Sequence, residues 1–148
     1  MKHSITTLLI SALFSFTLQA QEPITHVSKL SFSETVESLK KTIEQMDLQI
    51  IAEINHTQGA EKAGLHLAPT HVLIFGNPKV GTLLMQEDRG VALDLPLRML
   101  IYEKEERTYI SYHDPKSLSN VYQIVENARV LGKMNAVLAN ISKTVAIE

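Results

Sequence analysis

Two short segments with side chains of alternating character, separated by a charged run, most constrain the fold of this chain. Residues 97–103 place Leu97, Met99 and Ile101 on one side of an extended backbone, and residues 108–113 alternate in the same way. The charged run between the two segments is typical of a tight turn, so together they predict a β-hairpin. A hairpin needs antiparallel strands. The chain is therefore expected to contain an antiparallel sheet.

Helical periodicity marks three other segments. Residues 32–46 follow a capping box in which Ser31 is the N-cap residue and Glu34 reaches back to it. Residues 79–87 and 120–145 have apolar residues at helical spacing as well. The positions expected to face inward are Val80, Leu83, Leu84 and Met85 in the second helix, and Val121, Ile124, Ala128, Leu131, Met134, Leu138, Ile141 and Val145 in the third.

Further strands are predicted at residues 25–30, 48–55 and 71–76, which are rich in β-branched and apolar residues. The continuous apolar run of the third segment predicts a strand covered on both faces. Residues 56–64 predict a turn and one short helix that ends at its terminal glycine. The order of elements is typical of a single α+β domain, in which an antiparallel sheet has helices packed on one face.

The first 20 residues have the pattern of a secretory signal peptide. A basic start precedes the apolar run at residues 8–18, and the small Ala20 precedes a polar stretch. The run is shorter than the roughly 20 apolar residues that a bilayer requires. The sequence therefore predicts a signal peptide over residues 1–20 and one domain over residues 21–148. We expect the protein to be exported, periplasmic or secreted, with no integral membrane span after processing.

Composition excludes several classes of protein. The chain has no cysteine, which excludes a disulfide scaffold, a cysteine-based zinc site and a thiol enzyme. Fourteen basic and 16 acidic residues give a net charge of −2, which lacks the positive charge of a typical nucleic-acid binder. The histidines have no metal-binding spacing. We expect no cofactor, no metal and no nucleic-acid partner.

Three blocks of residues are similar to a bacterial and archaeal family known as domain of unknown function 302, and the resemblance spans residues 26–125. The blocks are Phe75-Gly76-Asn77-Pro78-Lys79-Val80-Gly81-Thr82-Leu83-Leu84-Met85, Leu93-Asp94-Leu95-Pro96-Leu97-Arg98 and Tyr112-His113-Asp114-Pro115. The resemblance implies a TBP-like β-α-β4-α fold that is often a homodimer, and no established activity. Some family members have cysteines at the positions of Phe75 and Leu97, so a thiol or metal role of those members does not transfer to this chain.

The segment from Gly76 to Thr82 is the strongest candidate for a ligand site. A predicted strand leads into a turn and a helix start, where backbone N–H groups favour an anion. Lys79 adds a cation and Thr82 a hydroxyl, and Arg98 follows a neighbouring turn as a second anion contact. A purely structural role is the alternative, in which the turn only sets the helix start and the lysine is solvated.

Three hypotheses for function remain open at this point. The first is a non-enzymatic binding domain for a small anionic or amphipathic ligand. The second is a homodimeric envelope interaction module, which predicts an exposed apolar patch on the last helix and no pocket of roughly 300 Å³ or more. The third is an enzyme that uses His56, His71 or His113 with a carboxylate about 3 Å away. The candidate ligand-binding residues are Asn77, Lys79, Gly81, Thr82, Arg98, His56 and His113.

Overall fold

The computed structural model of the protein describes residues 22–147, so the predicted signal peptide lies outside the described residues. The chain forms one α+β domain with five strands, as the sequence predicts. The elements are β1 (Ile24–Val27), α1 (Phe32–Gln45), β2 (Gln49–Asn55), α2 (His56–Lys62), β3 (Thr70–Gly76), α3 (Pro78–Glu87), the 3₁₀ helix η1 (Arg89–Leu93), β4 (Leu97–Lys104), β5 (Arg107–Tyr112), the 3₁₀ helix η2 (Pro115–Asn120) and α4 (Ala128–Lys143).

The five strands form one antiparallel sheet in the order β1-β5-β4-β3-β2. The predicted hairpin is its centre, and it closes with Lys104 opposite Arg107. The two residues of the turn, Glu105 and Glu106, have φ values of 52° and 59°. Positive φ at both positions is the geometry of a type I′ turn, whose twist matches that of the flanking strands.

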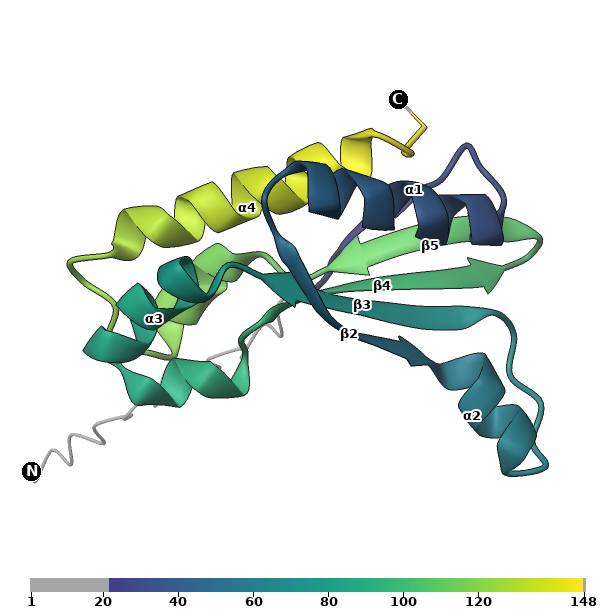
Figure 1. Cartoon of the computed structure of the whole chain (residues 1–148), viewed down its shortest axis with the longest axis horizontal. Helices are drawn as coiled ribbons and strands as arrows, with labels where there is room; N and C mark the ends of the chain where they lie inside the picture. Colours follow the sequence, from purple (N-terminus) through teal and green to yellow (C-terminus); the bar gives the residue numbers. More distant parts are fainter. Residues whose placement is uncertain (1–21, 148) are drawn as a thin grey trace, which may run out of the picture.

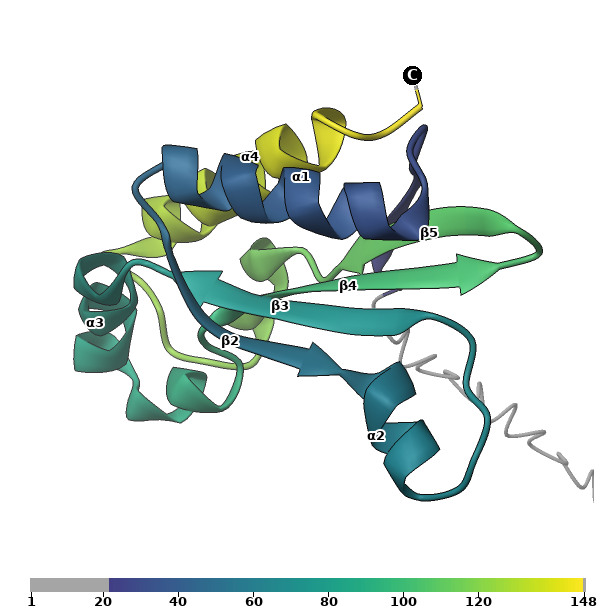
Figure 2. The ribbon, with the colours of Figure 1, turned by 45° about the vertical axis from the view of Figure 1, so that its right-hand side comes forward.

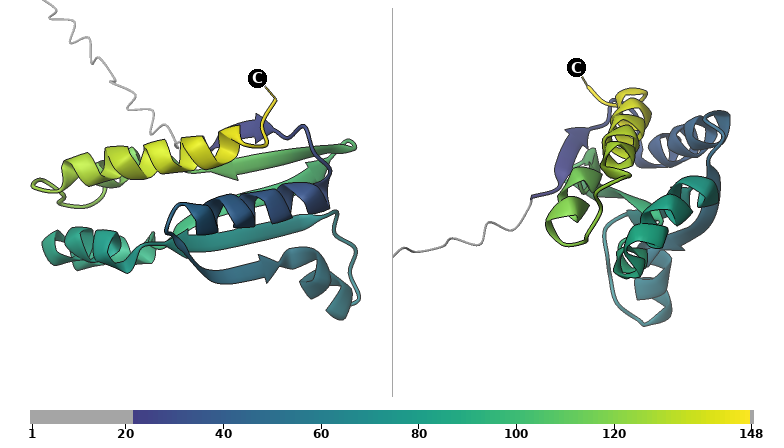
Figure 3. Two further views of the ribbon diagram at one scale, coloured as in Figure 1. Left: turned by 45° about the horizontal axis from the view of Figure 1, so that its top comes forward. Right: turned by 90° about the vertical axis from the view of Figure 1, so that its left-hand side faces the viewer.

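The helices α1 and α4 lie side by side over one face of the sheet (Figures 1 and 3). Their apolar faces and the inward side chains of the strands form the main hydrophobic core. Within residues 22–147, no helix lies over the opposite face of the sheet (Figure 2). The core residues are Val36, Leu39, Ile43, Leu73, Phe75, Met99, Ile101, Ile110, Tyr112, Leu138, Ile141 and Val145.

The predicted capping box at the start of α1 is confirmed. The hydroxyl of Ser31 accepts the N–H of Glu34 at 3.5 Å, and the carboxylate of Glu34 accepts the N–H of Ser31 at 3.1 Å. The short helix α2 is confirmed as well. Gly64 follows it with a φ of 74°, a backbone conformation that a glycine adopts without steric cost.

Two predictions about burial are wrong. Residues 71–76 are not covered on both faces by the part of the chain that the structure describes, because α1 and α4 lie over the same face (Figures 1 and 3). Leu73 and Phe75 are buried under them, whereas Val72 and Ile74 face the other way and are half-buried. In α3, Leu84 is buried as expected, but the side chain of Leu83 is 43% exposed.

The last helix begins later than predicted. It starts at Ala128, and the preceding residues form η2 and a turn in which Val121 is 72% exposed. The physical reason is a carboxylate from α3. Glu87 accepts the backbone N–H groups of Val125, Glu126 and Asn127, so these groups are not used in helical bonds to carbonyls four residues earlier. Within residues 22–147, no helix has the length and apolar character needed to cross a bilayer.

Candidate apolar pocket

An apolar pocket of about 490 Å³ lies where β3 ends and β4 begins, between α3 and α4. In Figure 1 this is the end of the sheet at which α3 lies and α4 starts. Side chains from both helices, from the start of β2 and from the segment before β4 form its walls. The pocket is lined by Leu48, Ile51, Gly76, Asn77, Pro78, Val80, Gly81, Leu83, Met85, Ala92, Leu95, Pro96, Leu97, Val130, Lys133, Met134 and Val137.

The lining is apolar or glycine everywhere except at Asn77 and Lys133. Lys133 is exposed and forms no ion pair within residues 22–147. Two large apolar side chains of the lining are also exposed, Ile51 at 50% and Leu83 at 43%. When an apolar molecule covers such a wall, apolar surface is removed from water and the free energy of the system falls.

The first turn of α3 is closed by its own hydrogen bonds. The side-chain oxygen of Asn77 accepts the N–H of Lys79 at 3.0 Å, and its backbone carbonyl accepts the N–H groups of Val80 and Gly81 at 3.0 and 3.1 Å. Pro78 has no N–H to donate. The backbone donors that we expected to bind an anion are therefore already used within the turn.

Gly81 makes room in the wall of the pocket. A Cβ atom at this position would meet Leu95 and Met85, each at 3.8 Å, which is ordinary contact. A methyl group therefore fits there, whereas a longer side chain would extend toward the space between α3 and the segment before β4.

The structure separates the residues that the sequence proposed as one site. Asn77 and Gly81 line the apolar pocket. Lys79 and Thr82 are exposed on α3 and are not part of the lining. His56 begins α2, at the opposite end of the sheet (Figure 1).

Arg98 and His113 line a second hollow of about 830 Å³, next to the ends of β4 and β5. Asp94 lies beside them, and its carboxylate is 3.5 Å from the guanidinium of Arg98. The same carboxylate accepts the hydroxyl of Tyr122 at 2.6 Å, and this hydrogen bond raises the pKa of that tyrosine. Because Asp94 balances the charge of Arg98, this hollow has no strong preference for an anion.

The carboxylate of Glu87 joins the two helical walls of the pocket. Glu87 is the last residue of α3, and its carboxylate accepts four hydrogen bonds from the segment that leads into α4. These are from the N–H groups of Val125, Glu126 and Asn127 at 2.7, 2.9 and 2.8 Å, and from the side-chain amide of Asn127 at 2.6 Å. The bond from Val125 contributes most to lowering the pKa of Glu87, and Asn127 and Glu126 add to it.

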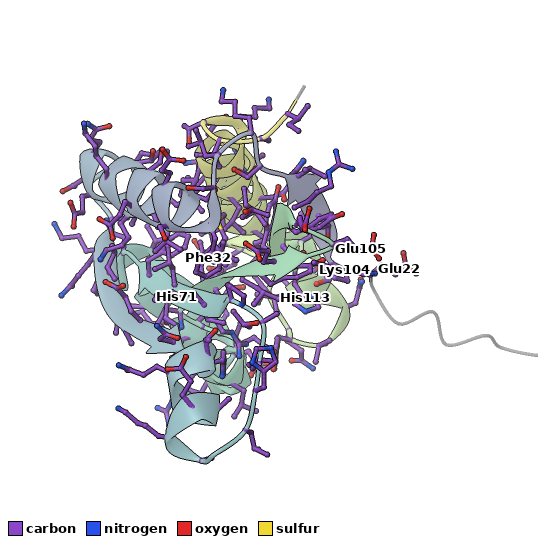
Figure 4. The ribbon with its side chains drawn as sticks, turned by 90° about the vertical axis from the view of Figure 1, so that its right-hand side faces the viewer. Glu22, Phe32, His71, Lys104, Glu105 and His113 are labelled. Carbon is purple, nitrogen blue, oxygen red and sulfur yellow. The ribbon has the colours of Figure 1, made fainter. Side chains whose placement is uncertain are left out.

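His71 lies away from both cavities. Its Nε2 atom is 3.3 Å from the carboxylate of Glu53, without the alignment of a hydrogen bond, and Lys40 of α1 approaches the other oxygen at 2.9 Å. The hydrogen bond from Lys40 lowers the pKa of Glu53. Figure 4 shows that His71, in β3, and His113, which follows β5, lie apart from each other. Within residues 22–147, no three His, Asp or Glu side chains come together in a way that could hold a metal ion.

Sequence reasoning missed the contribution of α4 to the pocket. Val130, Met134 and Val137 line it, and they follow one another at the spacing of one helix face. The predicted stripe included Met134 but neither valine. The sequence did contain a signal for this second surface. Val130 and Val137 lie beside the predicted stripe and widen the apolar face of the helix beyond what packing on the sheet alone requires.

The comparisons with known proteins agree on the fold. The family model described as "Domain of unknown function DUF302" matches residues 24–145. This match includes α4, so it extends beyond residue 125, where the resemblance in the sequence ended. The structure is also similar to the crystal structure of an uncharacterized conserved DUF302 protein from Bacillus stearothermophilus. The TM-score is 0.76 at 19% identity, over 83% of this chain and 97% of the other.

Curated relatives are longer than this chain. It is 36% identical over 102 residues to the fluoride-specific ion channel FluC 1 of Brucella suis biovar 1, and equally to FluC 1 of Brucella abortus biovar 1. The match takes in 68% of this chain and 40% or 38% of those proteins. The chain thus matches about two fifths of the length of these relatives.

Proposed function

The chain belongs to the family described as domain of unknown function DUF302, and from this premise we propose that it is a non-enzymatic domain that binds a small amphipathic ligand. The observation that carries the proposal is the apolar pocket of about 490 Å³ between α3 and α4. Its volume lies within the roughly 300–1,000 Å³ that is usual for small-molecule sites.

The same pocket favours ligand binding over a module without a ligand. A homodimeric interaction module predicts no such pocket and an exposed apolar patch on the last helix. In α4, however, Leu131, Leu138 and Ile141 are buried in the core. The pocket and the buried stripe both support the binding hypothesis.

We also propose that the domain acts outside the cytoplasm, in the periplasm or after secretion. The order of basic, apolar and small residues in the first 20 positions supports this proposal. The intact mass of the protein recovered from its native compartment tests it. A chain that begins at Gln21 is expected, and an unprocessed chain that stays inside the cell would contradict the proposal.

A bulky side chain at Gly81 tests whether the pocket binds ligands. We expect the domain to bind the neutral dye Nile red in saturable fashion with enhanced fluorescence, and Gly81→Leu to abolish this signal because the leucine occupies the pocket. Gly132→Leu is the matched control. It introduces the same residue into a helix at a glycine outside the pocket lining, where an added Cβ would meet no described atom within 4 Å beyond its chain neighbours and its own helix backbone.

The control separates pocket filling from damage to the fold. Circular dichroism shows whether each variant keeps its helices and sheet. If folded Gly81→Leu binds the dye as well as the parent does, or if Gly132→Leu loses binding equally, the pocket is not the site.

An interaction module is the second candidate function. The observation in its favour is that a similar region forms about two fifths of proteins named as fluoride-specific ion channels. The uncovered face of the sheet, with Ile54 41% exposed, would be the contact surface. Sedimentation of the domain tests the homodimeric form. A dimer that Ile54→Lys dissociates would support it, whereas a monomer at high concentration would contradict it.

A further inference from the structure

We propose that the pocket takes an amphiphile with one anionic head group, whose apolar chain lies between α3 and α4 and whose head lies beside Lys133. This inference rests on the proposed ligand-binding function and specifies the chemical class of the ligand. A carboxylate, sulfate or phosphate monoester on a single apolar chain belongs to the class.

The lining excludes ligands that are polar along their whole length. Apart from Asn77 and Lys133, no lining residue has a polar side chain. The side-chain oxygen of Asn77 already accepts the N–H of Lys79. Hydroxyl groups of a sugar or nucleotide would lose their water without gaining partners, which is unfavourable. An apolar chain meets no such penalty.

The position of Lys133 sets the sign of the head group. It lies three residues after Val130 and four before Val137, so all three side chains share one face of α4 and line the pocket. The methylene stem of a lysine packs along apolar surface while its ammonium stays in water. A ligand whose chain covers the valines therefore brings its head close to this ammonium.

Among the residues that the structure describes, Lys133 is the only charged residue that lines the pocket. No acidic residue lines the pocket, and Lys79 is not part of the lining. The backbone donors in the first turn of α3 are used by Asn77. Lys133 itself forms no ion pair within the part of the chain that the structure describes. The electrostatic preference of the site therefore comes from this one cation.

Displacement of bound Nile red tests the proposed class of ligand, with probes that differ only in the head group. Decanoate, decanol and decyltrimethylammonium would be titrated against the dye below their micelle concentrations. We expect decanoate to compete best and decyltrimethylammonium worst. Octanoate has two methylenes fewer than decanoate, and each buried methylene contributes about 0.8 kcal/mol, or roughly fourfold in affinity. We therefore expect octanoate to bind roughly 16-fold more weakly than decanoate.

The variant Lys133→Met keeps an apolar stem of similar length and removes the charge. It is expected to lower the affinity for decanoate by about two- to fivefold, as for the loss of an exposed ion pair, and to leave the affinity for decanol unchanged. Lys79→Met is the matched control, because it removes a cation from the exposed face of α3 without touching the pocket. It is expected to change neither affinity.

The outcomes distinguish this inference from the function on which it rests. If the dye and all three alkyl probes fail to bind, the proposed function fails and the inference with it. If the three probes compete equally and Lys133→Met changes none of them, the pocket binds ligands but has no preference for an anion. That result would overturn the inference alone.

Discussion

Ser31 and Glu34 show how single residues fix the start of α1. Each accepts the backbone N–H of the other, so two donors that a helix start leaves without partners are satisfied. The hydroxyl of Ser31 also donates to the carboxylate at 2.6 Å, and this bond is the main cause that lowers the pKa of Glu34. α1 contributes Leu39 and Ile43 to the core, so its placement matters to the whole domain.

Replacing Ser31 with alanine is expected to lower the free energy of unfolding by about 1 kcal/mol, the usual cost of a lost N-cap. Urea denaturation followed by circular dichroism measures the change. Ser33→Ala is the control, because Ser33 is exposed on the same helix turn and does not cap the helix. Equal losses in both variants would show that the hydroxyl of Ser31 has no special role.

At the scale of elements, α3 and α4 depend on each other. The N-cap residue of α4, Asn127, does not cap its own helix with its side chain. Glu87 accepts the N–H and the side-chain amide of Asn127, and a carboxylate near a helix N-terminus is favoured by the helix dipole. The contact also fixes one end of the pocket, because each helix forms one of its walls.

Glu87→Gln is expected to lower the Tm, because a neutral amide has one acceptor oxygen in place of two. The hydrogen bonds from residues 125–127 lower the pKa of Glu87, so the stabilising effect of its carboxylate is complete above the ordinary glutamate pKa of about 4.3. It is lost as the pH falls through the lower pKa of the folded state. The Tm difference between parent and variant should therefore be largest above about pH 5 and shrink in acid.

Thermal unfolding from neutral pH down to strongly acidic pH measures this dependence. Glu126→Gln is the control, because Glu126 is an exposed neighbour on the same turn that offers only its backbone N–H to Glu87. A Tm difference for Glu87→Gln that stays constant down to strongly acidic pH would contradict a role for the carboxylate charge.

For the whole molecule, the main consequence of the architecture is that the sheet has one covered face. Successive residues of a strand point to opposite faces, so neighbours along β3 have different environments. Phe75 is fully buried under the helices, and Ile74 on the other face is half-buried. The free energy of burial is therefore concentrated on one side.

Phe75→Ala is expected to lower the free energy of unfolding by about 3–5 kcal/mol, as for other large core residues. Ile74→Ala should lower the free energy of unfolding by clearly less, because part of the isoleucine surface is already in contact with water. Urea denaturation of both variants tests the difference. Equal costs would show that the second face of the sheet is covered as well, for example by another molecule.

The features that could be predicted from the amino-acid sequence are those that depend on nearby residues. The capping box at Ser31 acts over three residues, and the hairpin and the amphipathic helices follow from local alternation and periodicity. The order of elements and the α+β class followed from them, and the family resemblance agreed. The start of α4 and the set of residues that share a cavity depend instead on contacts between distant parts of the chain. Glu87 contacts Asn127 across 40 positions of the chain, and Lys133 meets the β2 and α3 walls of the pocket only after folding. Contacts of that range leave no period in the sequence, because they depend on how whole helices pack.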